Sequence, residues 1–410
     1  MSMEEQLLQL GRQAREAANQ LRILSADARS EAISAMARQV RDAVLEIVTA
    51  NEKDMTAATA NHDRLMLDET RVFTMADALD EVAALPDPVG AEMARWQRPN
   101  GLDIARVRTP IGVIGMIYES RPNVTADAAA ICIRSGNAVI LRSGSDALNS
   151  SIAIHRALQA GLAEAGLPIH AVQLIDTPDR AAVSALLGGL GGSVDLVIPR
   201  GGKGLVQRVQ DDAKVPVLSH LEGVCHTYVH KAADPEDAVS IVRNAKMRRV
   251  GICGATECLL IDEAVAPSLL PQIAAALDGC ELRGDERARA IVPMEEATAE
   301  DWGKEYLAPI LAVRIVDGLE QAVEHITTYG TAHTEAIITE DAVAAETFLN
   351  EVDSAIVIWN ASTQFADGGE FGFGAEIGIA TGKMHARGPV GPEQLTSFHY
   401  VVRGTGQVRP

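Results

Sequence analysis

The chain has 410 residues, 47% of them apolar, so it can bury a large core and form two or three domains. Its 36 basic and 56 acidic side chains give a net charge of −20, which disfavours nucleic acid and anionic membranes as partners. No stretch approaches the roughly 20 apolar residues of a membrane span, and the acidic N-terminus is unlike a secretory signal. We therefore expect a cytoplasmic α/β protein.

The cysteines are unlike those of a disulfide-bonded or zinc-binding framework. They are odd in number and contain no Cys-x-x-Cys pair, so we expect neither a disulfide network nor a metal site. The five are Cys132, Cys225, Cys253, Cys258 and Cys280.

The first predicted elements are helices that lead into a parallel sheet. Residues 3–84 show helical periodicity, and Asn100-Gly101 predicts a hairpin turn before a strand at 102–107. Beyond residue 111, short apolar runs alternate with helices, which indicates parallel strands buried on both faces. The runs lie at 112–118, 138–141, 171–175 and 194–198, and the helices at 124–134, 147–165, 179–187 and 202–212. This part predicts a doubly wound, Rossmann-like domain.

A second α/β series begins near residue 227. Its strands are expected at 227–230, 257–261, 335–339 and 355–359, with helices at 234–246, 265–278, 318–329 and 341–349. The segment after residue 391 is rich in Gly and Pro and ends in an isolated strand at 398–402. Such a strand needs a pairing partner, which another subunit could provide.

Two glycine-bearing turns are candidates for binding a phosphate group. The usual Gly-x-Gly-x-x-Gly fingerprint is missing, but Arg142-Ser143-Gly144 and Gly201-Gly202-Lys203 each connect a predicted strand to a helix. Free amides at a helix N-terminus, with a basic side chain beside them, suit a pyrophosphate. The alternative is two tight turns with solvated bases.

Cys253 is the candidate nucleophile. It is followed by Gly254 and preceded by Lys246, Arg248 and Arg249, whose charge would favour the thiolate. The alternative is a small buried apolar residue, the usual fate of a free cysteine.

Asn123 is the candidate oxyanion donor. It follows a buried strand at a helix start, where its amide could stabilise a developing negative charge. The alternative is an N-cap of that helix.

The order of these blocks resembles the aldehyde dehydrogenase superfamily. The similar segments are Ile111-Gly-Val-Ile-Gly with Arg121-Pro-Asn123, then Ser135-Gly-Asn-Ala-Val-Ile-Leu-Arg142-Ser-Gly, Leu221-Glu222-Gly223, Cys253, and Glu305. More specific blocks are similar to the γ-glutamyl phosphate reductase family. They are 118–125, 199–202, 316–337 and 371–389. The resemblance covers nearly the whole chain, although Gly254 stands where the family usually has Asn.

The resemblance implies an aldehyde dehydrogenase-like fold in three parts. Residues 1–97 and 111–226 would form a cofactor-binding domain, and residues 227–388 a catalytic domain. Residues 98–110 and 389–410 would form a small β oligomerisation element.

The resemblance also implies the activity, namely NADPH-dependent reduction of γ-glutamyl phosphate to glutamate 5-semialdehyde and phosphate in proline biosynthesis. Cys253 would form a thioester, and Asn123 would hold the oxyanion. The expected cofactor-binding residues are Arg142, Ser143, Gly144, Gly201, Gly202 and Glu305. The expected substrate-binding residues are Arg121, Lys246, Arg248 and His333. Expected partners are other copies of the chain and glutamate 5-kinase.

Two other functions fit parts of the sequence. Glu222 could activate water against the thioester, as in a hydrolytic NAD(P)-dependent aldehyde dehydrogenase. A catalytically silent scaffold could keep the same fold, although Cys253 would then have no purpose.

Overall fold

The computed structural model describes residues 2–60 and 62–409, and the chain folds into two compact units. Unit 1 contains the residues up to Ser219 together with 372–378 and those from Val390 onwards. Unit 2 contains 220–371 and 379–389. The compact units divide at 219/220, because the backbone of Gly223 and Val224 hydrogen-bonds to side chains of unit 2. The boundary at 226/227 between the cofactor-binding and catalytic domains stays a prediction. No helix among the described residues has the length and apolar character needed to cross a membrane.

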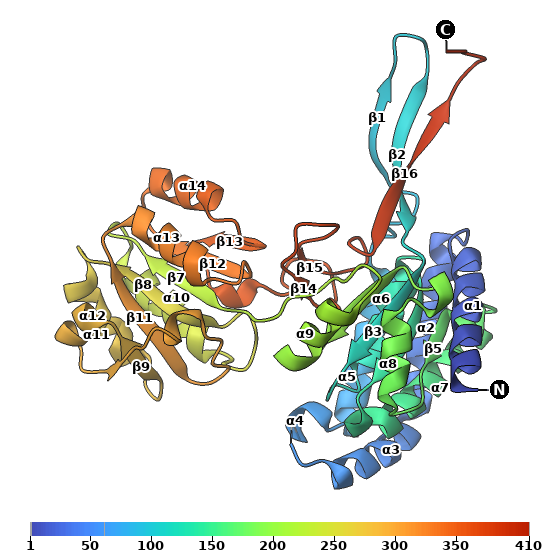
Figure 1. Ribbon diagram of the computed structural model, residues 1–410, viewed down its shortest axis with the longest axis horizontal. Coiled ribbons are helices and arrows are strands. Elements are labelled where there is room, and N and C mark those ends of the chain that lie inside the picture. Colours follow the sequence, from blue (N-terminus) through green and yellow to red (C-terminus); the bar gives the residue numbers. More distant parts are fainter. Residues whose placement is uncertain (1, 61, 410) are drawn as a thin grey trace. The chain divides into compact units, whose positions relative to one another are not determined.

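Unit 1 is built on a four-stranded parallel sheet with the strand order β5-β4-β3-β6 (Figure 1). This order matches strands 3-2-1-4 of a Rossmann fold, which confirms the predicted doubly wound sheet. Every residue of β3 and β4 is buried, because helices cover both faces. The strands are β3 (Val113–Tyr118), β4 (Ala138–Ser143), β5 (Val172–Leu174) and β6 (Leu196–Arg200).

The helices of unit 1 match the predicted periodicity closely. Several begin at an Asp or Ser whose side chain accepts a backbone N–H of the first turn, as Ser25 does from Ala28. The helices are α1 (Met3–Leu21), α2 (Ala26–Asp42), α3 (Val44–Ala57), α4 (His62–Leu65), α5 (Glu69–Ala84), α6 (Val124–Arg134), α7 (Leu148–Glu164), α8 (Arg180–Leu187) and α9 (Lys203–Asp212).

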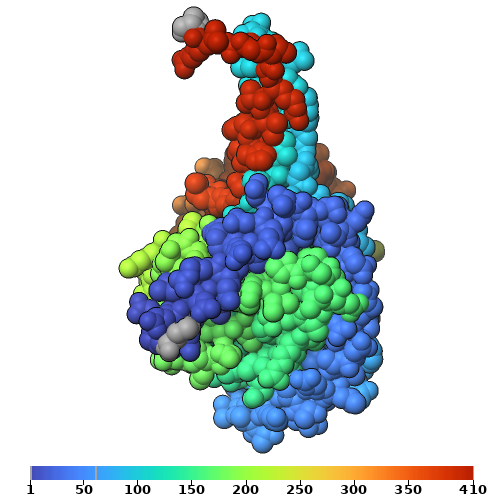
Figure 2. Space-filling view, turned by 90° about the vertical axis from the view of Figure 1, so that its right-hand side faces the viewer, coloured from blue at the N-terminus to red at the C-terminus, as the bar shows by residue number. Residues whose placement is uncertain are grey.

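A three-stranded antiparallel arm also belongs to unit 1. It consists of β1 (Glu92–Gln97), β2 (Asp103–Pro110) and β16 (Thr396–Arg403), and Figure 2 shows the C-terminal strand lying along the hairpin. The expectation that the last strand takes its pairing partner from another subunit is wrong. Its register runs from Thr396 opposite Pro110 to Arg403 opposite Asp103, so β2 of the same chain supplies the hydrogen bonds.

Unit 2 is built on a seven-stranded parallel sheet with the order β10-β9-β11-β8-β7-β12-β13. Its strands are β7 (Cys225–Val229), β8 (Thr256–Asp262), β9 (Glu281–Gly284), β10 (Glu295–Glu296), β11 (Ile310–Val316), β12 (Thr334–Ile338) and β13 (Ile356–Trp359). Three of these strands, β9, β10 and β11, were not predicted from the sequence. β9 is short and partly exposed, and both residues of β10 are exposed, whereas β11 is apolar except for Arg314, so its signal was present.

Helices flank this sheet at the expected places, apart from α12 (Glu286–Ile291), which was not predicted, and a two-stranded antiparallel pair completes the unit. The other helices are α10 (Pro235–Met247), α11 (Ala266–Ala276), α13 (Leu319–Tyr329) and α14 (Ala342–Glu351). The short pair is β14 (Ile379–Ala380) with β15 (Gly388–Pro389). Together these elements give the predicted α/β fold.

Candidate active site

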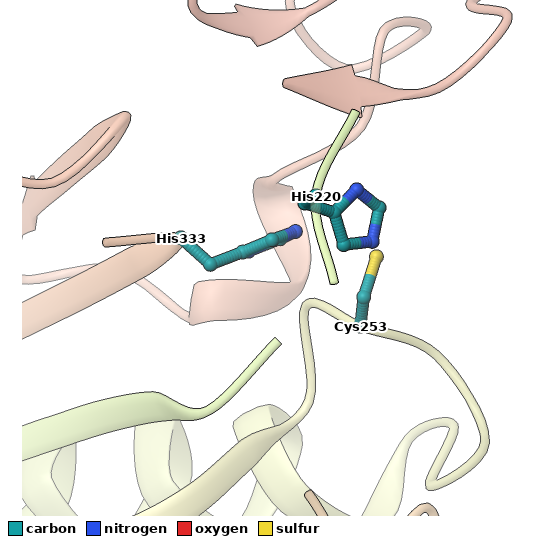
Figure 3. Close-up of side chains that lie close together, drawn as sticks. All are labelled: His220, Cys253 and His333. Atoms are coloured by element: carbon teal, nitrogen blue, oxygen red, sulfur yellow. The ribbon is translucent and has the colours of Figure 1, made fainter. Parts of the chain in front are cut away.

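Cys253 lies in unit 2, in the loop that joins α10 to β8. Its side chain is half-buried, unlike Cys132, Cys225 and Cys258, which are buried. The sulfur faces two imidazoles, those of His220 and His333 (Figure 3). Cys253 Sγ and one ring nitrogen of each histidine lie within 4.8 Å of one another. A partly accessible thiol between two bases is the arrangement that a cysteine nucleophile needs.

Both histidines are held by hydrogen bonds on the side away from the sulfur. The His220 Nδ1 donates to the carbonyl oxygen of Ile379 at 2.6 Å. The His333 Nδ1 lies 2.9 Å from Thr334 Oγ1 and 3.5 Å from Cys225 Sγ. The two rings meet edge to face, with centroids 5.0 Å apart. In both residues Nδ1 is engaged, so the Nε2 atoms are directed at Cys253.

The pKa of the Cys253 thiol is well below its usual value. Burial acts to raise this pKa, but the charges of His333 and His220 and their contacts with the sulfur outweigh it. The basic residues upstream in the sequence, which were expected to favour the thiolate, are not the source of this lowered pKa. Arg248 is exposed, and Lys246 forms an ion pair with Glu257. The histidines come from distant segments and act at much shorter range.

We expect the rate at which Cys253 reacts with iodoacetamide to fall less steeply from pH 8 to pH 6.5 than that of an ordinary thiol. Its lowered pKa leaves a larger share of thiolate at the lower pH, whereas an ordinary thiol loses roughly tenfold in thiolate for each pH unit below about 8.5. Site-resolved mass spectrometry with a chelator present measures the rate at each thiol. Cys280 is the internal control, since burial raises its pKa to about 11. A Cys253 rate that follows the same slope as Cys280 would contradict this prediction.

The segment before β7 packs directly against the nucleophile loop. Gly223 is in such close contact that a Cβ there would lie 2.3 Å from the Cys253 carbonyl oxygen. The Gly223 amide donates to Glu305 Oε1 at 3.0 Å, and the Val224 amide donates to Thr331 Oγ1 at 3.0 Å. Cys225 Sγ donates to the Cys253 carbonyl at 3.0 Å. These contacts fix the position of the nucleophile loop against the sheet.

Glu305 therefore lies in the same neighbourhood as Cys253. Burial raises the pKa of its carboxyl, the Gly223 amide lowers it, and the charges of Cys253 and Glu222 raise it further. Glu222 is half-buried and is also close enough to act on Glu305. The role of Glu305 in holding a nicotinamide ribose stays a prediction.

Three candidate regions contain a residue with left-handed backbone. Ser120, Leu307 and Ala332 have φ values of 53°, 52° and 57°. Each lies within three residues of a predicted site residue. Non-glycine residues rarely adopt this conformation, and such strain concentrates at functional sites.

Lys246 does not present its ammonium to solvent. Its side chain is fully buried, it donates to Glu257 Oε2, and it lies 5.8 Å from the centre of the Tyr306 ring. The other oxygen of Glu257 accepts the Leu307 amide at 3.1 Å. These contacts give Lys246 a structural partner, so they do not support its predicted role in substrate binding. The pair ties α10 and β8 to the loop that contains Glu305.

We expect Lys246→Met to destabilise the protein by about 3 kcal/mol, because it leaves a buried carboxylate without its partner. Burial raises the Glu257 pKa to about 7 even with Lys246 beside it. A carboxyl group with a raised pKa stabilises the folded protein at low pH. That contribution is lost as the pH rises from 4.5 to the pKa of the group in the folded state. Without Lys246 that pKa is higher still, so the deficit of the variant grows above pH 7.

Urea unfolding at pH 6 and pH 8 measures this effect. The control is Lys383→Met, which removes an exposed ion pair with Asp353 and should change stability little. Equal stability of the Lys246→Met variant and the parent at pH 8 would refute the prediction.

The remaining substrate candidates lie on two elements. Arg248 is exposed at the end of α10, and its guanidinium lies 3.4 Å from Gln364 Oε1. Arg121 and Asn123 belong to unit 1, just before α6, and Asn123 is exposed. Asn123 does not cap α6 with its side chain. Its amide instead donates to Asp127 Oδ2 at 2.9 Å. The oxyanion role of Asn123 and the substrate roles of both arginines stay predictions.

The first predicted turn of unit 1 has buried polar atoms without a partner in the described part of the chain, and the second begins a helix that no side chain caps. Arg142 Nε and Ser143 Oγ are buried without a hydrogen-bond partner among the described residues. Gly202 begins α9 with no side-chain cap, and no atom lies within 4 Å of where its Cβ would be. Gly144 and Gly201 are more crowded, since a Cβ at either would meet an acidic side chain. Open amides at a helix N-terminus and unpaired donors fit a pyrophosphate.

Sequence reasoning missed three residues of this site: His220, Cys225 and Gly223 as a packing residue. His220 directly precedes Leu221-Glu222-Gly223, so the motif marked its neighbourhood but not its role. The importance of Gly223 depends on a contact with Cys253, thirty residues later in the chain. No local pattern reveals such a contact.

Comparisons with known proteins agree with the fold. The sequence model described as the aldehyde dehydrogenase family matches residues 2–306. The γ-glutamyl phosphate reductase of Caulobacter vibrioides is 63% identical over 410 residues, covering 98% of this chain and 99% of that protein. The crystal structure of the Thermotoga maritima γ-glutamyl phosphate reductase is similar with a TM-score of 0.96 at 44% identity, covering 98% of this chain and all of that one. An acetylating aldehyde dehydrogenase from Geobacillus thermoglucosidasius, 19% identical with a TM-score of 0.71, shares the fold.

The parallel sheets of the two units and the cysteine between two bases define an oxidoreductase of the aldehyde dehydrogenase type. With these relatives, the chain belongs to the γ-glutamyl phosphate reductases of the aldehyde dehydrogenase family. It therefore acts in proline biosynthesis and uses NADPH. These relatives favour reduction over the hydrolytic and scaffold alternatives.

Proposed function

We propose that Cys253 carries out the reduction of γ-glutamyl phosphate through a covalent thioester. The observation that supports this proposal is the half-buried sulfur directed at two anchored imidazoles. In the first step the thiolate attacks the acyl carbon. Phosphate leaves with the electron pair of the acyl carbon–oxygen bond, so no acid is needed to protonate it. The carbonyl group then remains bound to sulfur as a thioester.

When bound, NADPH supplies the hydride that reduces the thioester. The resulting alkoxide re-forms a carbonyl group by expelling the Cys253 thiolate, which releases glutamate 5-semialdehyde. A low thiol pKa makes this sulfur a good leaving group as well as a ready nucleophile. His220 and His333 therefore assist both the first and the last step by stabilising the same anion.

The cofactor is proposed to bind to the turns of unit 1. Arg142 Nε, Ser143 Oγ and the open amides at Gly202 are the donors for its phosphates. Each step at carbon passes through an oxyanion, for which Asn123 is the proposed side-chain donor. A donor of this kind is typically worth about 3 kcal/mol.

The reverse reaction separates the reductase from the hydrolytic alternative. We expect oxidation of glutamate 5-semialdehyde by NADP to require inorganic phosphate, because phosphate must cleave the thioester. If Glu222 activates water instead, oxidation will proceed at the same rate without phosphate. Initial rates of NADPH formation with and without phosphate decide between the two.

We also propose a homo-oligomer formed through the arm. Trp96, Phe398, Tyr400 and Val402 expose apolar surface on its strands, and such patches are typical of association surfaces. Light scattering should show a species larger than the 43.5 kDa chain. A monomer at every concentration would contradict this proposal.

The instability of the substrate supports a cytoplasmic location and a contact with the enzyme that produces the substrate. An acyl phosphate hydrolyses readily, so direct transfer from glutamate 5-kinase in the cytoplasm would protect it. Sedimentation of the mixed proteins tests for this contact, and separate unshifted species would exclude a stable complex.

A further inference from the structure

The three side chains of the active site also have the composition of a metal site. Thiolate sulfur and imidazole nitrogen are the ligands that zinc prefers. A tetrahedral Zn²⁺ ion bound at about 2.3 Å to sulfur and about 2.0 Å to nitrogen holds its ligand atoms about 3.5 Å apart. The ligand atoms of His220, Cys253 and His333 already lie within 4.8 Å of one another. Small side-chain rotations would bring them to that spacing.

The hydrogen bonds that anchor the two histidines are made by Nδ1, so Nε2 is the nitrogen on the side of the sulfur. His220 Nδ1 donates to the Ile379 carbonyl, so in the neutral ring the lone pair is on Nε2, which faces the sulfur, and a metal ion replaces the proton that the charged ring carries there (Figure 3). His333 is fully buried, and its Nε2 has no hydrogen-bond partner among the described residues. Histidines that bind metals are usually oriented in this way, through a carbonyl or hydroxyl on the other nitrogen.

A second cluster has the same residue types but differs from the active-site cluster in its burial and in which histidine nitrogen carries the proton. His226, Cys258 and His325 also lie within 4.8 Å of one another, but all three are buried. The Arg314 guanidinium donates to His325 Nδ1 at 2.8 Å, so the His325 proton must be on Nε2, facing Cys258. That nitrogen has no lone pair for a metal. At the active site, by contrast, Cys253 and His220 are only half-buried, which leaves a path for an ion and a position for water.

We propose that Cys253, His220 and His333 form a binding site for Zn²⁺, and that the bound ion reversibly inhibits the reductase. The metal would occupy the sulfur lone pair that otherwise attacks the acyl carbon. Binding follows from the ligand geometry alone, whereas inhibition also rests on the proposed role of Cys253. The two parts therefore need separate measurements.

Binding is measured with Co²⁺ as a spectroscopic probe on the chelator-treated full-length protein. We expect a thiolate-to-cobalt charge-transfer band that saturates at one equivalent and disappears when Zn²⁺ is added. Cys253→Ser should abolish the band, and His333→Gln should weaken Co²⁺ binding by about 100-fold or more. Cys280→Ser, which removes a half-buried thiol elsewhere, should leave the band unchanged. No band, or a band that persists in Cys253→Ser, would overturn the site.

Inhibition is measured as the rate of NADPH oxidation with increasing Zn²⁺. We expect loss of activity over the concentration range in which Zn²⁺ displaces cobalt, and full recovery with EDTA. If the cobalt band is present but zinc leaves the rate unchanged, the site stands and both the inhibition and the nucleophile role of Cys253 fail. If zinc inhibits without displacing cobalt from Cys253, the ion acts elsewhere and the proposal is wrong.

Discussion

Cys253→Ser is expected to lower the rate of γ-glutamyl phosphate reduction by on the order of 10³-fold or more. A serine hydroxyl stays protonated at neutral pH, and two imidazoles that stabilise a thiolate cannot ionise it. NADPH binding should be unchanged, because the proposed cofactor turns lie in unit 1. Steady-state kinetics and fluorescence titration with NADPH measure the two effects.

Cys280→Ser is the matched control for this substitution. Cys280 is also half-buried and lies in unit 2, but it follows α11 and is not part of the nucleophile loop. Its substitution should leave the rate near that of the parent. A Cys253→Ser protein with full activity would disprove the thioester mechanism.

Gly223→Ala is expected to reduce activity by about 100-fold without removing any reacting group. The added Cβ would lie 2.3 Å from the Cys253 carbonyl oxygen and 2.8 Å from Cys253 Cβ, distances that folded proteins do not tolerate. The nucleophile loop must therefore move, and a displacement of about 1 Å at a reacting atom typically costs this much in rate. We also expect a loss of stability of about 1–3 kcal/mol from overpacking.

The steric origin of this effect can be tested with another glycine of unit 2. At Gly382 a Cβ would meet no atom within 4 Å, so Gly382→Ala should keep both activity and stability. For Gly223→Ala, the measurements are kcat, the pH dependence of Cys253 alkylation, and urea unfolding. A displaced sulfur should lose contact with the histidines, so its alkylation should shift toward the pH range of an ordinary thiol. A folded Gly223→Ala protein with parental kcat would show that the close contact is not needed.

The sequence was sufficient for the architecture of both units. Alternation of short apolar runs with amphipathic helices has physical causes that act locally, because strands and helices bury side chains with different periods. The observed α6 and α13 thus agree with their predicted ranges to within one residue at each end. Cys253 and His333 could be selected from motifs because their chemistry is carried by residue type.

Only the tertiary structure showed how those residues work together. The low pKa of Cys253 comes from His220 and His333, which lie on separate segments and meet only when the sheet of unit 2 has formed. Lys246 and Arg248 are closer to Cys253 in the sequence and were expected to lower its pKa. In the folded protein Lys246 is buried and paired with Glu257, and Arg248 is exposed at the end of a helix.

Residue type and local periodicity determined the α/β elements and the parallel arrangement of their strands, and they selected Cys253 as the proposed nucleophile. The tertiary structure alone decided which bases face the sulfur, why residue 223 must be glycine, and that the last strand pairs within its own chain. The reason is that electrostatic and packing energies depend on distances in space. Segments far apart in the chain become neighbours only in the folded state, so their sequence separation does not reveal those distances.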